Sequence, residues 1–113
     1  MADWWNDLMP EIKHAKPPGA QLMLRIIAYD ISDPRRLRRV ANVCLDFGVR
    51  IQKSVFECWL DQDRFEELWR RLGLALNLDE DFIVAYELDE KAARKRLTHG
   101  RRTLTEKRAA YVF

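Results

Sequence analysis

An acidic residue at the end of an apolar stretch is the first candidate for chemistry in this chain. Asp30 follows the apolar run Ile26-Ile27-Ala28-Tyr29, and the chain continues directly into Ser32-Asp33-Pro34. Burying an unpaired carboxylate is energetically costly, so an acid at the end of a buried strand is placed better for chemistry than for stability. Two interpretations stay open from this pattern alone. Asp30 either belongs to a functional site or accepts backbone N–H bonds at the turn from strand to helix.

Arginines crowd the segment that follows Asp30. Asp33 and Pro34 predict the start of a helix, because aspartate caps helix N-termini and proline is tolerated at the first helical position. Gly48 is the predicted end of that helix. The first turns, where the helix dipole is already positive, hold Arg35, Arg36, Arg38 and Arg39. We therefore expect an anion nearby, supplied either by acids such as Asp30 and Asp33 or by nucleic acid phosphates.

Residues 50–60 predict two short strands or one bent strand. In a straight strand, Phe56, Cys58 and Leu60 would lie on one face. Ile51 is an odd number of residues away from them and would lie on the opposite face. A bend or bulge near Lys53-Ser54 resolves this mismatch. Bulges cluster near functional sites, which makes Ser54 and Phe56 further candidates.

The order of the elements predicts the fold. A second helix follows Asp61 and carries an apolar stripe in which we expect Trp69 to lie in the core, and a last strand covers residues 82–88. Strand, helix, two strands, helix and strand make an α+β ferredoxin-like βαββαβ sandwich, with helices on one face of an antiparallel sheet. The first strand is central in this topology. Asp30 should therefore emerge at the end of the sheet beside the arginine-rich helix start.

Composition narrows the class of protein. The 113 residues fit one domain, and no apolar run approaches the roughly 20 residues that a membrane span requires. The N-terminus lacks the pattern of a secretory signal, which predicts a cytoplasmic protein with no membrane partner. Cys44 and Cys58 stand singly among apolar residues, which favours reduced core thiols over a disulfide or a metal site.

Breaker residues and charge divide the chain into three predicted segments. Residues 1–22 form an N-terminal leader and linker, residues 23–89 the ferredoxin-like domain, and residues 90–113 a basic C-terminal arm. The arm holds eight Lys or Arg against two acids. Such clusters are typical of a polyanion partner, although a solvated helix without a partner has the same composition. The terminal Tyr111-Val112-Phe113 is suited to docking on a partner.

Several short motifs resemble the signature of a known family. They are Tyr29-Asp30-Ile31-Ser32-Asp33-Pro34, Arg39-Val40, Gly48-Val49-Arg50-Ile51-Gln52 and Ser54-Val55-Phe56-Glu57. In this order and separation they are similar to the small CRISPR-associated adaptation protein, the metal-dependent endonuclease-like partner of the CRISPR integrase. The resemblance covers about residues 23–90. Lys53 stands where that family often has an aromatic residue, so a stacking role at this position is not carried over.

The resemblance implies a homodimer in which two copies of Asp30 face each other and share one divalent metal ion, usually Mg²⁺. Mg²⁺ is normally held by one or two carboxylates with waters and phosphate oxygens, so a single Asp30 is half a site. The implied activity is metal-dependent cleavage of RNA or DNA, with phosphodiester bonds as the target. Besides Asp30, the implied site holds Tyr29, Ser54 and Phe56 in positioning roles and Arg38, Arg39 and Arg50 as nucleic-acid-binding residues.

Two other functions stay open. A non-catalytic scaffold would bridge CRISPR integrase dimers and hold duplex DNA on its basic surface during spacer acquisition, and Asp30 would then be dispensable. An RNA-binding module of the same fold would place aromatic residues on the open sheet face, but the aromatic residues of this chain do not recur in that pattern.

Overall fold

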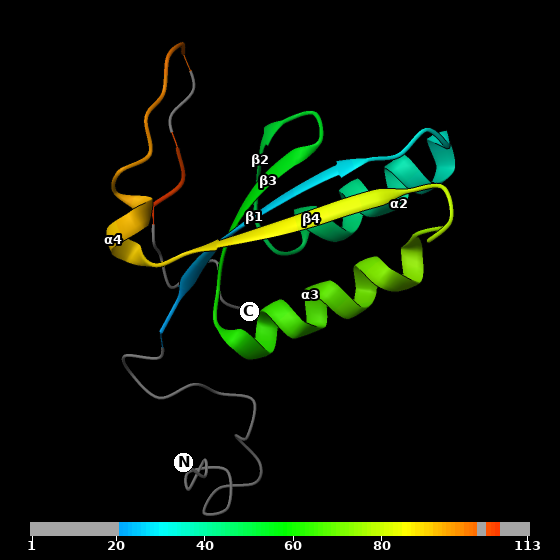
Figure 1. Cartoon of the computed structure of the whole chain (residues 1–113), viewed down its shortest axis with the longest axis horizontal. Coiled ribbons are helices and arrows are strands. Elements are labelled where there is room, and N and C mark those ends of the chain that lie inside the picture. Colours follow the sequence, from blue (N-terminus) through cyan, green and yellow to red (C-terminus); the bar gives the residue numbers. More distant parts are fainter. Residues whose placement is uncertain (1–20, 102–103, 107–113) are drawn as a thin grey trace, which may run out of the picture.

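The computed structural model describes residues 21–101 and 104–106. Its elements are, in order, β1 (Met23–Asp30), α2 (Pro34–Leu45), β2 (Val49–Gln52), β3 (Val55–Leu60), α3 (Gln62–Ala75), β4 (Phe82–Leu88) and the short helix α4 (Glu90–Ala93). The antiparallel sheet has the strand order β2-β3-β1-β4, with α2 and α3 packed on one of its faces (Figure 1). This is the ferredoxin-like arrangement, and the predicted fold class is confirmed.

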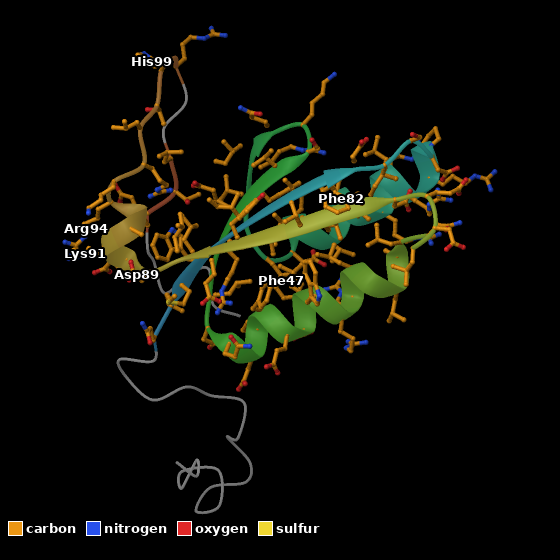
Figure 2. The ribbon with its side chains drawn as sticks, in the orientation of Figure 1. Phe47, Phe82, Asp89, Lys91, Arg94 and His99 are labelled. Carbon is orange, nitrogen blue, oxygen red and sulfur yellow. The ribbon has the colours of Figure 1, made fainter. Side chains whose placement is uncertain are left out.

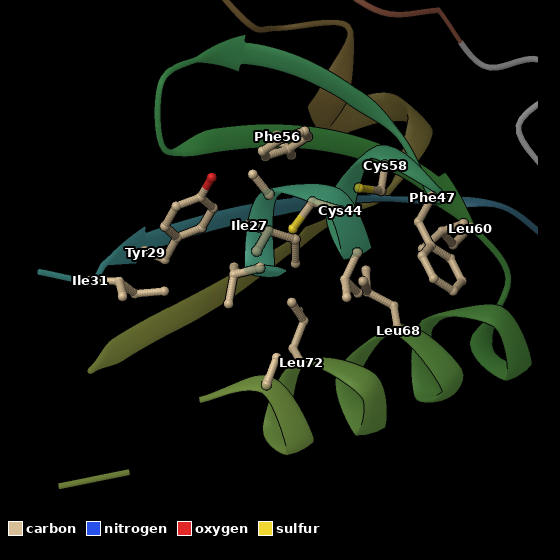
Figure 3. Packing of buried hydrophobic residues seen from close by; sticks show 14 residues of the cluster. Ile27, Tyr29, Ile31, Cys44, Phe47, Phe56, Cys58, Leu60, Leu68 and Leu72 are labelled. Carbon is tan, nitrogen blue, oxygen red and sulfur yellow. The ribbon is translucent and has the colours of Figure 1, made fainter. Parts of the chain in front are cut away.

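Alternation along β1 directs its side chains to two different surroundings. Ile27 and Tyr29 point into the core between the sheet and the two helices, where they meet Phe56, Leu68 and Leu72 (Figure 3). Full burial of an aliphatic side chain of this size contributes about 1.5–3 kcal/mol, so this layer holds α2 and α3 against the sheet. The alternate residues of β1, which end with Asp30, lie on the opposite face.

Helix α2 begins as predicted but ends for a different reason. Asp33 caps it by accepting a 2.9 Å hydrogen bond from the backbone N–H of Arg36, and Pro34 is its first residue. The helix stops at Leu45, and the only positive φ among the described residues is that of Gly100. The expectation that Gly48 ends the helix is therefore wrong. A Cβ atom on Gly48 would lie 2.5 Å from the Sγ of Cys58 and closer still to the carbonyl oxygen of Glu57, so close packing requires glycine there.

The segment between the helices is a hairpin of two strands. Lys53 and Ser54 form the turn between β2 and β3, and the strand register shifts between Arg50 and Gln52. The shift leaves Ile51 as the extra residue. A turn and an irregularity together thus resolve the parity mismatch noted in the sequence.

Burial confirms one core prediction and contradicts another. Cys44 and Cys58 are free and fully buried. Trp69 is 41% exposed and packs against Phe65 with ring centroids 5.8 Å apart, so its expected place in the core is wrong. None of the helices in the described ranges is long and apolar enough to cross a membrane.

The described part of the arm packs onto the sheet through a polar cluster. The buried Glu57 carboxylate accepts hydrogen bonds from Arg96, at 2.7 Å, and from both the backbone N–H and the hydroxyl of Thr105. Lys91 and Arg94 are exposed on α4, and the loop that carries His99 extends away from the sheet (Figure 2). Residues 1–20 of the leader and Tyr111-Val112-Phe113 lie outside the described residues, and the three-segment division stays a prediction.

Candidate metal and nucleic-acid site

Asp30 is the last residue of β1 and is exposed to solvent. Its cross-strand partner on β4 is Phe82. Within residues 21–101 and 104–106, no group forms a hydrogen bond or ion pair with its carboxylate. The expectation of a buried acid is therefore wrong for the single chain, and the capping role considered for Asp30 belongs to Asp33. An exposed carboxylate without a partner is free to bind a ligand.

Tyr29 and Phe56 support the Asp30 end of the sheet from the opposite face. Both side chains are buried, and their rings stack with centroids 6.3 Å apart. The Tyr29 hydroxyl donates to the carbonyl oxygen of Lys53 at 3.3 Å, and the Tyr29 backbone N–H donates to that of Ser54 at 3.1 Å. Burial raises the pKa of the Tyr29 phenol, with Arg50 acting against the shift. A protonated phenol facing the core is suited to positioning and not to proton abstraction.

Arg50 lies on the rim of the same end of the sheet. Its guanidinium lies 5.3 Å from the centroid of the Phe56 ring, and its Nε donates to the Lys53 carbonyl oxygen at 3.1 Å. These two contacts hold the exposed Arg50 side chain over the turn between β2 and β3. Arg50 is thus presented near, but not on, the face that carries Asp30.

The arginines at the start of α2 have different surroundings. Arg36 binds Asp81 through two hydrogen bonds, Nε to Oδ2 at 2.7 Å and Nη2 to Oδ1 at 3.1 Å, and also contacts Glu80. These bonds hold the pKa of Asp81 below its usual value and raise that of Arg36. Acids therefore compensate Arg36. Arg38 and Arg39 are exposed and have no side-chain partner in the part of the chain that the structure describes.

A hollow on the outer side of α2 is lined by the other arginines of the helix start. Arg38 and Arg39 line it together with Arg35 and Asn42, and Arg71 of α3 closes it beside Asp46. Several guanidinium groups around one open hollow suit phosphate oxygens, which arginine binds through two parallel N–H groups. The sequence did not indicate that Arg71 belongs to this hollow. Its Nη2 donates to the Oδ2 of Asp46 at 2.9 Å, although the two residues are 25 positions apart in the chain. Helical spacing alone could not place the two residues together.

The face of the sheet that carries Asp30 is apolar and largely open. In register, Asp30 lies beside Phe82, Ala28 beside Val84, and Ile26 beside Tyr86. Phe82 and Tyr86 are 64% and 60% exposed. Figure 2 shows Phe82 at the start of β4, away from the helix that packs beneath the strand. Two large exposed aromatic residues on the same apolar face of a strand are typical of an interaction surface.

The described residues of one chain do not form a closed metal site. Among the described residues, no group of three or more His, Cys, Asp or Glu side chains is arranged to hold a metal ion. Mg²⁺ sites in nucleic-acid enzymes commonly use one or two carboxylates, with waters and phosphate oxygens as the other ligands. The Asp30 carboxylate, which has no partner in the described ranges, fits one position in such a set.

Comparison with known proteins identifies the class to which this fold and surface belong. The family model for CRISPR associated protein Cas2 matches residues 23–96. The crystal structure of Streptococcus pyogenes Cas2 superimposes with a TM-score of 0.62 at 34% identity, covering 68% of this chain and 99% of that one.

Two curated relatives extend the match. CRISPR-associated endoribonuclease Cas2 1 of Moorella thermoacetica is 44% identical over 75 residues, covering 62% of this chain and 78% of its own length. CRISPR-associated endonuclease Cas2 2 of Thermus thermophilus is 43% identical over 63 residues, covering 56% and 70%. The chain belongs to the Cas2 family of CRISPR-associated proteins. It is therefore a member of a nuclease family that acts in CRISPR adaptation.

Proposed function

We propose that this protein acts as a homodimer in CRISPR adaptation and cleaves phosphodiester bonds of RNA or DNA with Mg²⁺ or another divalent cation, one per dimer. The observation that carries the proposal is the unpaired Asp30 carboxylate at the end of an open apolar sheet face. The names of the relatives, which include an endoribonuclease and an endonuclease, support phosphodiester cleavage, and the first of them supports RNA as a substrate. The proposed location is the cytoplasm, with the CRISPR integrase as partner.

The open face supports a second copy of the chain as its occupant. Phe82 and Tyr86 each present an aromatic surface, and burying an aromatic side chain removes roughly 150–250 Å² from water. Asp30 lies at the edge of this patch, next to Phe82. Face-to-face packing about a twofold axis makes the same patch serve both partners. An axis that passes beside Asp30 would bring the two Asp30 carboxylates together.

The chain's own residues have distinct roles in this proposal. The two Asp30 carboxylates would hold the cation, which when bound neutralises charge on the scissile phosphate and activates water. Arg38, Arg39 and Arg50 would bind flanking phosphates through their guanidinium groups. Tyr29 and Phe56 would hold the end of β1 from beneath, and Ser54 would anchor it through the carbonyl oxygen that accepts the Tyr29 N–H.

Cleavage by the Asp30→Asn variant tests the proposal. Purified protein is incubated with short RNA and DNA, with and without Mg²⁺. We expect the wild-type rate to require the cation and to fall at least about a hundredfold in Asp30→Asn, since metal-ligand loss removes the main electrostatic contribution. Asp63→Asn removes another exposed acid, from α3, and should keep the wild-type rate. Equal cleavage by Asp30→Asn and the wild type would exclude the metal role.

A non-catalytic scaffold is the second candidate, and the exposed arginines around the α2 hollow favour it. In the double variant Arg38→Ala/Arg39→Ala, the slope of log K for duplex binding against log salt concentration should become shallower by about two, because two phosphate contacts are lost. Arg70→Ala, an exposed arginine of α3, is the matched control. If spacer integration with the integrase fails in the double variant and persists in Asp30→Asn, the scaffold is the function. No association with integrase or duplex would contradict both candidates.

A further inference from the structure

Asp81 is a buried acid that lies outside the proposed metal site and has no role in the proposed function. Its side chain is 1% exposed, although it lies in the loop between α3 and β4. It accepts both hydrogen bonds from Arg36 and a third, at 2.8 Å, from the backbone N–H of Asn77. The two bonds from Arg36 join the start of α2 to the residue before β4, and the bond from Asn77 fixes the loop that holds the carboxylate.

The Arg36–Asp81 contact connects the two segments that adjoin Asp30, the start of α2 and the start of β4. Phe82, which follows Asp81, is the cross-strand partner of Asp30, and Arg36 lies six residues after Asp30 in the first turns of α2. The Arg36 backbone N–H is also bonded to the Asp33 cap. The connection from β1 to α2 is therefore held at both ends, by strand pairing at Asp30 and by the guanidinium of Arg36.

We propose that Arg36 and Asp81 are positioning residues that hold the end of β1 so that Asp30 presents its carboxylate to the divalent cation. This inference rests on the proposed function. A planar guanidinium bound by two parallel hydrogen bonds fixes both distance and orientation. Lysine at position 36 would keep the charge but lose this geometry. Partners that orient a metal ligand typically change metal affinity by about 10–100-fold when removed.

The test separates geometry from charge. Mg²⁺ affinity is measured by calorimetry on the full-length dimer for Arg36→Lys and Asp81→Asn. The control is Asp79→Asn, which removes an exposed acid of the same loop whose carboxylate makes no contact with Arg36 and leaves both Arg36–Asp81 bonds in place. We expect about tenfold weaker Mg²⁺ binding in both clamp variants and less than about a twofold change in the control.

Hydrogen exchange supplies a readout that does not depend on the metal. In the clamp variants, peptides covering residues 30–37 should exchange about tenfold faster, because local opening becomes easier. Peptides covering residues 55–60 should be unchanged. Equal loss of affinity in Asp79→Asn and Asp81→Asn, or unchanged affinity and exchange in both clamp variants, would overturn the inference. Absence of Mg²⁺ binding by the wild type would instead overturn the proposed metal site, and with it the cation role of the clamp.

Discussion

At the scale of single residues, tertiary contact and not local geometry explains Gly48. Its backbone lies so close to Glu57 and Cys58 of β3 that no side chain fits between them. Gly73, in contrast, lies in α3 with open space where its Cβ would be. The two glycines therefore form a matched pair, one required by packing and one that lowers helix stability.

Substituting these two glycines should have opposite effects on the free energy of unfolding. Gly48→Ala should destabilise the protein by about 1–3 kcal/mol, because the overlap forces the hairpin and α2 apart. Gly73→Ala should stabilise it by about 0.5–1 kcal/mol through better helix propensity. Urea denaturation monitored by circular dichroism measures both. Equal stability of Gly48→Ala and the wild type would mean that β3 is not packed as closely as described.

Residues near Asp30 also mark the boundary of what the sequence could predict. Asp33 and Pro34 indicated the helix start because a cap depends on neighbours in the chain. The different roles of Arg36 and Arg38 could not be foreseen, since the Asp81 that compensates Arg36 is 45 residues away. Likewise, helical spacing placed Trp69 on the apolar side of its helix. It could not show whether the sheet covers the Trp69 side chain.

At the scale of elements, ion pairs add to the apolar core contacts that place α2 against the rest of the domain. The Arg36–Asp81 contact joins its start to the loop before β4, and the Arg71–Asp46 pair joins its end to α3. The order of strands and helices was predictable, because hydrophobic periodicity changes visibly along the chain. The contacts that set the position of α2 were not, because each joins residues far apart in sequence.

The Arg36–Asp81 pair predicts how stability changes in acid. Because Arg36 lowers the pKa of Asp81 in the folded state, the charged form stabilises the fold above the unfolded-state value of about 3.9. That contribution is lost as pH falls through the lowered folded pKa. The melting temperature of Asp81→Asn should lie below that of the wild type at pH 6, and the gap should narrow toward pH 2. A gap that widens in acid would contradict the assignment.

At the scale of the whole molecule, the open sheet face and the exposed cations lie on different surfaces. The apolar patch is on the side of the sheet opposite α2 and α3, whereas the hollow of arginines is on the outer side of α2. A dimer formed through the patch would therefore leave the arginines free for nucleic acid. The motif around Asp30 was recognisable in the sequence, but it could not show that the carboxylate has no partner among the residues that the structure describes.

Disrupting the patch should separate the two copies. Tyr86→Glu places a charge at a 60% exposed position of the open face, and we expect it to weaken dimerisation about a hundredfold or more, as loss of an aromatic anchor does. Leu74→Glu, at a 74% exposed position on α3, is the control and should leave the dimer intact. Sedimentation velocity over a range of concentrations measures both. Dissociation by Leu74→Glu but not by Tyr86→Glu would place the interface on the helices.

The stoichiometry of Mg²⁺ binding tests most directly whether Asp30 is half of a shared site. Calorimetric titration of the full-length protein should give one ion per two chains, because the proposed site takes one carboxylate from each of two chains and completes its ligand set with waters. Asp30→Asn should abolish the binding, and Asp63→Asn should preserve it. One ion per chain, or unchanged binding in Asp30→Asn, would contradict a shared site built on Asp30.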